Sequence, residues 1–247
     1  MQRTHQPDLP RLCERCGYDV DSLSKDQVCP ECGSSVDGVR TGSAWQQQPS
    51  LGSWLKTNTA VVLHPLRTFS NIIPEHARST RLLWINSFVT ALCFAVIPML
   101  PGPSRSGLRT WLTHSSSTRI EFVVSGAVLV LGTLAVAGLS HAESLGFRLI
   151  GKRRKWRITP DVARSIVSHA SIGWLIFAVV TIGLMIVANQ IADNALRHGS
   201  GEKRLYLMFM PVEAALLGAG LSLLCFETLA YIGLLRCRYA NGHSPVV

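Results

Sequence analysis

The hydrophobic and polar positions of this 247-residue chain change character near residue 54. Before that point, isolated apolar side chains stand among polar ones, and no long apolar run occurs. After it, polar stretches separate four long apolar runs, at residues 82–100, 122–140, 170–192 and 205–235. The pattern predicts a short polar N-terminal segment followed by a helical domain.

The four runs have the length and composition of transmembrane helices. The first three contain no charged residue, and the fourth contains only Glu213 and Glu227. A hydrocarbon core about 30 Å thick requires about twenty helical residues, and each run has at least nineteen. Buried helices of a soluble protein would carry polar faces, which these runs lack. We therefore predict an all-α bundle of four transmembrane spans over residues 82–240.

Basic residues flanking the spans predict the orientation. Eleven lie on the side of the N-terminus: Arg67, Arg78, Arg81, Lys152, Arg153, Arg154, Lys155, Arg157, Arg164, Arg236 and Arg238. Six lie on the other side: Arg105, Arg109, Arg119, Arg197, Lys203 and Arg204. No apolar run of signal-peptide type follows Met1. Because basic flanks face the cytoplasm, we expect a multi-pass protein of the inner (plasma) membrane with both termini in the cytoplasm.

Composition agrees with this class of protein. Charged residues make up 16% of the chain, compared with about 25% in a typical soluble protein. Residues 1–50 carry five basic and seven acidic side chains, whereas residues 51–247 carry nineteen basic and eight acidic ones. The net charge of +9 therefore belongs to the apolar part. This distribution excludes a secreted disulfide scaffold, a disordered chain and a conventional basic domain that binds nucleic acid.

Two C-x-x-C pairs lie near the N-terminus. Cys13 and Cys16 form the first pair, Cys29 and Cys32 form the second after twelve intervening residues, and a glycine follows each pair. Two such turns can place four sulfurs at the corners of a tetrahedron, about 2.3 Å from a zinc ion. A segment with so few large apolar side chains needs metal binding to supply its folding free energy. We predict a zinc site in residues 1–36.

The four cysteines have three other interpretations: two disulfides, a thioredoxin-like redox motif and an iron site. Disulfides suit an oxidising compartment, and a thioredoxin-like motif needs one C-x-x-C near a βαβ unit. Iron fits the same four sulfurs and stays open as an alternative. The segment CERCGYDV…CPECG resembles the short zinc ribbons, with rubredoxin-type knuckles, at the start of many bacterial membrane proteins. The resemblance covers residues 11–36, with Val20 where leucine is commoner, and implies a structural or interaction module with these ligands: Cys13, Cys16, Cys29 and Cys32.

Two segments are expected between the ribbon and the first span. Residues 37–53 are rich in Gly, Ser and Gln and predict a flexible linker. Residues 54–81 form a juxtamembrane segment with four apolar residues at helical spacing: Val62, Leu66, Phe69 and Ile73. They predict an amphipathic helix over residues 62–74 in the membrane interface, or alternatively a helix packed on the rest of the protein. The sequence VVLHPLRTF faintly resembles the entry to Yip1-type membrane domains.

Polar residues within or beside the spans are candidates for function. Glu213 and Glu227 lie about 21 Å apart along a helix, too far for a paired-carboxylate mechanism. His141 and Glu143 end the second span, and His169 begins the third. A metal or proton site formed by His141, Glu143, His169 and Glu227 is one hypothesis. Helix ends that form hydrogen bonds at the interface are the favoured interpretation.

The sequence therefore predicts a membrane protein that is not an enzyme, with the ribbon as an interaction or structural module. Its expected partners are the lipid bilayer, a protein bound to the ribbon and a second copy of the chain. One alternative is a membrane-tethered, rubredoxin-like electron-transfer protein that holds iron. The other is a small transporter or channel using Glu227. The basic run at residues 152–157 is interpreted either as a lipid-headgroup site or as a topology signal alone.

Overall fold

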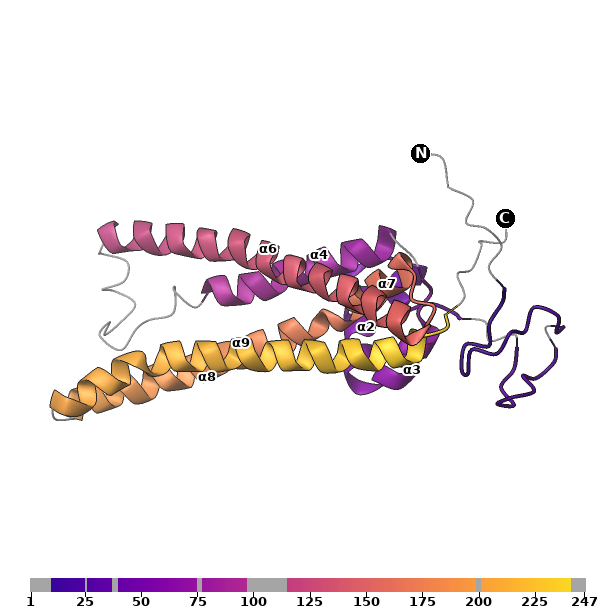
Figure 1. The fold of residues 1–247 in the computed structure, drawn as a ribbon. Coiled ribbons are helices and arrows are strands. Elements are labelled where there is room, and N and C mark those ends of the chain that lie inside the picture. Colours follow the sequence, from indigo (N-terminus) through magenta and orange to yellow (C-terminus); the bar gives the residue numbers. More distant parts are fainter. Residues whose placement is uncertain are drawn as a thin grey trace. The chain divides into compact units, whose positions relative to one another are not determined.

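The computed structural model describes residues 10–24, 26–36, 40–74, 77–96, 115–198 and 201–240, without the side chains of residues 115–121, 189, 192–198 and 201–212. This part of the chain contains helices and no strand (Figure 1). The helices are α1 (Ala44–Gln47), α2 (Leu51–Leu63), α3 (Pro65–Asn71), α4 (Ala77–Val96), α6 (Ser115–Arg154), α7 (Pro160–Ala170), α8 (Ile172–His198) and α9 (Gly201–Cys237).

Four helical stretches are long and apolar enough to cross a membrane: Ala77–Val96, Phe122–Arg154, Pro160–Ala188 and Glu213–Cys237. Each overlaps one predicted run, so the prediction of an all-α protein with four spans and an N-terminal cysteine cluster is confirmed. The chain is a membrane protein. The side of the membrane on which its termini lie stays a prediction.

Some predicted features fall outside the described residues. The end of the first run, residues 97–100, is one of them. The others are the basic residues expected on the far side of the membrane, either wholly or in their side chains: Arg105, Arg109, Arg119, Arg197, Lys203 and Arg204.

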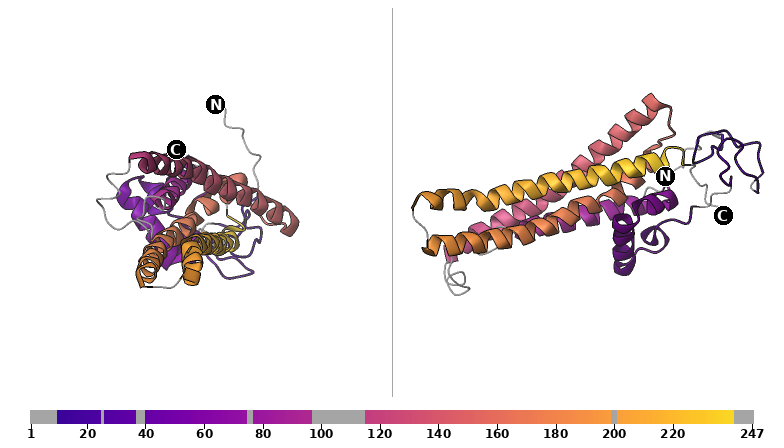
Figure 2. Two further views of the ribbon diagram at one scale, coloured as in Figure 1. Left: turned by 90° about the vertical axis from the view of Figure 1, so that its left-hand side faces the viewer. Right: turned by 90° about the horizontal axis from the view of Figure 1, so that it is seen from below.

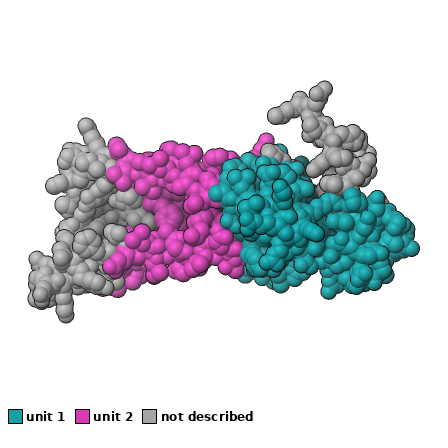
Figure 3. Space-filling view, viewed as in Figure 1, with its two compact units in different colours: residues 1–80, 141–169, 230–247 teal, residues 81–140, 170–229 magenta. Residues whose placement is uncertain are grey.

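The chain divides into two compact units (Figure 3). Unit 1 contains residues 1–80, 141–169 and 230–247, and unit 2 contains residues 81–140 and 170–229. Helices α6 and α9 are each unbroken and contribute residues to both units (Figures 1 and 2). Unit 1 holds the cysteine-rich segment, and unit 2 holds most of the apolar length of the spans.

Helices of unit 2 approach one another closely where small residues face a neighbour. A Cβ atom added at Gly173 would lie 2.5 Å from the backbone nitrogen of Phe226, and one added at Gly218 would collide with Thr181. The rings of Trp174 and Phe226 stack beside this contact with centroids 5.1 Å apart. Because lipid provides no hydrophobic drive between helices, close van der Waals packing of this kind holds α8 against α9.

Unit 1 combines close packing with buried hydrogen bonds. A Cβ atom at Gly233 would lie 2.7 Å from side-chain atoms of both Phe69 and Ile166, so α3, α7 and α9 meet there. The buried His169 ring has both nitrogens engaged, with Nδ1 2.8 Å from the Ser165 carbonyl oxygen and Nε2 2.9 Å from Ser43 Oγ. These contacts fix α7 against the segment that precedes α1.

Residues 40–53 differ from the flexible linker that their composition predicts. Ser43 caps α1 in a capping box with Gln46, and Ser50 caps α2 in the same way. The buried Trp45 donates from Nε1 to the Arg78 carbonyl oxygen at 2.9 Å, and Gln46 donates from Nε2 to the Ile73 carbonyl oxygen at 2.6 Å. The Ser and Gln side chains that indicated flexibility are those that cap helices and satisfy buried backbone groups.

The predicted helix over residues 62–74 is wrong in its limits and in its buried face. The helix is interrupted at His64, between α2 and α3, because Pro65 lacks an N–H group and is suited to the first turn of a new helix. Phe69 is fully buried in unit 1, whereas Val62 and Leu66 of the predicted stripe are exposed. The burial of Phe69 favours the alternative of a helix packed on the rest of the protein.

Candidate metal centre

Each C-x-x-C pair forms a tight loop that is closed by backbone hydrogen bonds. In the first loop, the Gly17 amide donates to the Cys13 carbonyl oxygen at 2.8 Å, and the Cys13 amide donates to Tyr18 at 2.8 Å. An isolated antiparallel bridge between Leu12 and Asp19 closes the base of the loop. This geometry directs the sulfurs of Cys13 and Cys16 to the same side of the loop.

The second loop repeats these contacts sixteen residues later. The Gly33 amide donates to Cys29 at 2.8 Å, the Cys29 amide donates to Ser34 at 2.8 Å, and a bridge joins Val28 to Ser35. The glycine that follows each pair has a left-handed conformation, with φ of 82° at Gly17 and 66° at Gly33. Glycine adopts this conformation without steric cost, which explains its place after both pairs.

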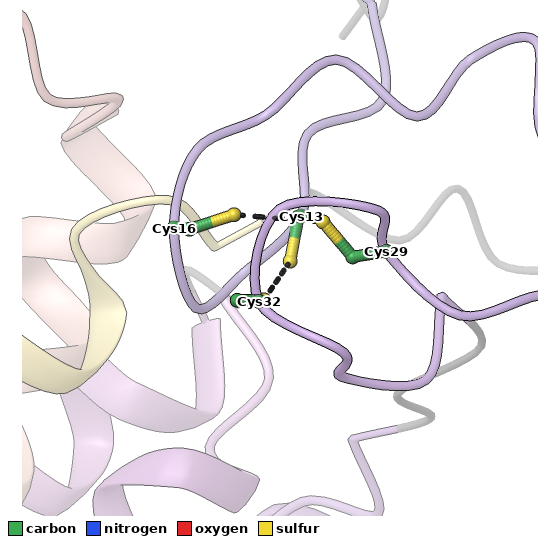
Figure 4. A group of neighbouring side chains, drawn as sticks. All are labelled: Cys13, Cys16, Cys29 and Cys32. Carbon is green, nitrogen blue, oxygen red and sulfur yellow. Dashed lines mark hydrogen bonds between the residues drawn. The ribbon is translucent and has the colours of Figure 1, made fainter.

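The four sulfurs gather between the two loops (Figure 4). The distance from Cys13 Sγ to Cys32 Sγ and that from Cys16 Sγ to Cys29 Sγ are both 3.6 Å, and all four atoms lie within 4.8 Å of one another. A tetrahedron with metal–sulfur bonds of about 2.3 Å has edges of about 3.8 Å, whereas a disulfide bond is about 2.05 Å long. All seven cysteines of the chain are free. The four sulfurs are therefore arranged to hold a metal ion.

The cluster combines thiols of different acidity. Cys13 and Cys29 are buried, and Cys16 and Cys32 are half-buried. Burial raises the pKa of the Cys16 thiol to about 12 and also raises the pKa of Cys13. Hydrogen bonds with Ser34 lower the pKa of Cys32 to about 6. A metal ion binds the thiolate form, so its binding must displace protons from the less acidic sulfurs.

The cysteine-rich segment, residues 10–36, which we call the ribbon, has a very small apolar core. Val20 is buried beside Cys13 and Cys29, and Leu23 and Val36 are only partly buried against this group. So small a core cannot offset the conformational entropy of ordering some twenty-five residues. The cysteines thus form most of the core, which makes the ribbon dependent on what they bind.

Arg40 connects the ribbon to the helices of unit 1. It is buried, and its Nε donates to Glu14 Oε2 at 2.7 Å. Its Nη1 donates to the Ile72 carbonyl oxygen at 3.0 Å, at the end of α3. Burial acts to lower the pKa of Arg40, but Cys237 and Glu14 raise it above its usual value. Sequence reasoning missed this residue because one arginine in a polar segment has no periodicity or motif.

A second set of contacts joins the ribbon to residues that follow α6 and α9. The ring of Tyr239 covers Gly17, where an added Cβ would lie 2.7 Å from two ring carbons. Arg238 donates from Nη2 to the Arg15 carbonyl oxygen at 2.9 Å, and Arg157 donates to the Pro10 carbonyl oxygen at 2.6 Å. The ribbon therefore packs on the rest of unit 1 through residues within and beside its first cysteine pair.

The other predicted candidates do not form a second cluster. Among the described side chains, the four cysteines are the only group of three or more His, Cys, Asp or Glu residues with ligand atoms close enough to hold a metal. His169 forms the hydrogen bonds described above, and His141 is exposed on α6. Glu143 and Glu227 are half-buried, and Glu213 is exposed. For His169, the interpretation as a hydrogen-bonded helix end agrees with the structure.

Fold and site together define a helical membrane protein with a four-cysteine cluster arranged to hold a metal ion. Comparison of the chain with known protein families, with curated proteins and with solved structures finds no match. The resemblances to rubredoxin-type ribbons and to Yip1-type domains therefore stay predictions.

Proposed function

We propose that this chain is an integral membrane protein in which a structural zinc ribbon serves as an interaction module, and that it is not an enzyme. Cys13, Cys16, Cys29 and Cys32 are the proposed zinc ligands. The observation that carries the proposal is the pair of 3.6 Å sulfur–sulfur distances across two matching loops. Four protein sulfurs leave no open coordination position, which is typical of structural rather than catalytic zinc.

The surface of the ribbon supports a role in binding a protein partner. Glu14, Arg15 and Gly17 contact the rest of unit 1. Tyr18 and Val28 instead expose 42% and 61% of their surface to solvent, although both are apolar or aromatic. Exposed aromatic side chains such as that of Tyr18 are enriched where proteins bind one another. The metal would hold the two loops that carry them in one orientation.

Elemental analysis of the purified full-length chain tests the metal assignment. We expect one zinc per chain and a colourless protein. Replacement of Cys16 and Cys32 by serine should reduce the zinc content to background, whereas Cys93→Ser should leave it unchanged because Cys93 lies outside the cluster. An iron content of one per chain with visible absorption would replace the proposal with the electron-transfer alternative. Zinc that survives the double substitution would place the site elsewhere.

A further inference from the structure

Helix α6 ends in a basic turn, which we define as residues 152–157. Lys152, Arg153 and Arg154 form the last turn of the helix, and Lys155 follows with φ of 56°. The Trp156 amide donates back to the Gly151 carbonyl oxygen at 2.8 Å. This is the hydrogen bond of a Schellman ending, whose left-handed position glycine usually occupies. A lysine there carries a conformational cost and adds a cation.

Packing fixes the conformation of the basic turn. A Cβ atom added at Gly151 would lie 2.8 Å from Cβ of Ile158, so the chain folds tightly back on the end of the helix. The Arg154 guanidinium lies 5.8 Å from the centre of the Trp156 ring. Cation–π contact at this distance holds the arginine near the ring while leaving its N–H groups available to an acceptor.

A second basic segment lies beside the turn, at the end of α9. The Arg157 amide donates to the Arg238 carbonyl oxygen at 2.8 Å, which joins the two segments. Arg236 lies in the last turn of α9, and the Arg238 guanidinium lies 5.2 Å from the centre of the Tyr239 ring. Both segments thus combine arginines with an aromatic ring at the end of a membrane-spanning stretch.

The exposed cations of the basic turn and of the end of α9 have no acidic counterpart among the described side chains. In unit 1, the carboxylates of Glu14 and Asp161 pair with Arg40 and Arg164. Within the described part of the chain, no carboxylate pairs with the exposed cations: Lys152, Arg153, Arg154, Lys155 and Arg236. Cations gathered without a counter-charge repel one another, and a bound anion relieves that repulsion.

We infer that the basic turn and Arg236 bind the phosphate groups of anionic phospholipids. The ends of spans lie at the level of lipid headgroups, where tryptophan and tyrosine also concentrate. Arginine forms bidentate hydrogen bonds with phosphate oxygens. Nucleic acid and free phosphate share this chemistry, but the position at the ends of two spans favours lipid. None of the four cysteines takes part in this lipid site.

Quenching of tryptophan fluorescence by brominated lipids tests this site in the reconstituted full-length chain. Brominated phosphatidylglycerol and brominated phosphatidylcholine are compared, and the signal lost in Trp156→Phe gives the contribution of Trp156. We expect Trp156 to prefer phosphatidylglycerol. Because each cation contributes about a fivefold change in affinity near an anionic surface, replacement of Arg153 and Arg154 by glutamine should lower the preference about thirtyfold.

Matched variants separate a specific site from general charge. Lys56→Gln with Arg67→Gln also removes two exposed cations of unit 1 and should leave the preference unchanged. Replacement of Arg153 and Arg154 by lysine should retain most of it. Equal loss in the control pair, or equal quenching by the two lipids in the wild-type chain, would overturn the inference. Displacement of phosphatidylglycerol by micromolar inorganic phosphate or by a short oligonucleotide would also overturn it in favour of a soluble ligand.

Discussion

Both compact units of this chain contain closely packed helices, but unit 1 also contains the cysteine-rich segment and the polar side chains that fasten it. In unit 1, single polar side chains such as Arg40, Gln46 and His169 satisfy buried backbone or hydroxyl groups. In unit 2, helices touch where Gly173 and Gly218 remove a side chain from the interface. The comparison teaches that a lipid-exposed unit and a unit with a polar cysteine-rich segment are stabilised in different ways. Unit 2 needs close packing between apolar helices, whereas unit 1 also needs specific hydrogen bonds and the proposed metal to order a polar segment.

Metal removal should show most clearly that the two units are stabilised differently. Zinc binding contributes about 10–16 kcal/mol to the folding of small zinc peptides. In the described part of the ribbon, Val20 is the one fully buried apolar side chain besides the cysteines. A strong chelator should therefore unfold residues 10–36 while the helices of unit 2 persist. Limited proteolysis with mass spectrometry would show new cuts in the ribbon, and circular dichroism would show nearly unchanged helix content. Loss of the helical signal on chelation would contradict the independence of unit 2.

The converse change is Gly218→Leu, which should damage unit 2 and spare the ribbon. An added side chain would collide with Thr181 on α8, and overpacking of this kind typically costs about 1–3 kcal/mol or more. The melting temperature in detergent should fall, while the zinc content stays at one per chain. Gly126→Leu is the matched control, because nothing lies within 4 Å of a Cβ atom at Gly126. Equal destabilisation by both substitutions would refute the proposed close contact.

Substitution of Arg40 tests whether this side chain fastens the ribbon to the helices of unit 1. Arg40→Met removes the partner of Glu14 and leaves the Ile72 carbonyl oxygen without its donor. Loss of a buried, charge-assisted hydrogen bond costs about 1.5–3 kcal/mol. We expect faster hydrogen exchange in the first cysteine loop and at the end of α3, with zinc still bound. In a double-mutant cycle with Glu14→Gln, additive effects would show that the ion pair contributes nothing.

Acidification should weaken the metal site in steps set by its thiols. In the folded ribbon, burial raises the pKa of Cys16 to about 12 and also raises that of Cys13, whereas hydrogen bonds with Ser34 lower that of Cys32 to about 6. Between pH 6 and pH 8 both Cys13 and Cys16 keep their protons and must release them to bind metal, so the affinity falls by about a hundredfold or more for each unit of decreasing pH. Below pH 6 Cys32 also takes up a proton, and the fall becomes steeper. Competition with a zinc-binding dye between pH 5 and pH 8 measures the slope, and a flat profile would argue against thiolate ligation.

The sequence predicts the two units unequally well. Long apolar runs place the four spans, because burial in lipid constrains every residue of a helix in the same way. The two C-x-x-C-G motifs predict the cysteine cluster, because ligand chemistry and glycine conformation act locally. Residues 40–74 were harder to predict. Their structure depends on tertiary contacts of Trp45 and Phe69 with distant parts of unit 1, which leave no local periodicity.

The smallest expected effect concerns the left-handed lysine of the basic turn. Lys155→Gly relieves a backbone conformation that costs a non-glycine residue about 1 kcal/mol, although glycine also gains freedom in the unfolded chain. We expect a net gain of about 0.5 kcal/mol in the free energy of unfolding. Lys152→Gly removes the same charge from a helical position, where glycine costs up to about 1 kcal/mol. The two variants should therefore lose phosphatidylglycerol preference equally while their melting temperatures move in opposite directions. Stabilisation by Lys155→Gly with weaker lipid binding would indicate that the lysine is kept for its charge, and unchanged binding in both variants would assign the turn a structural role alone.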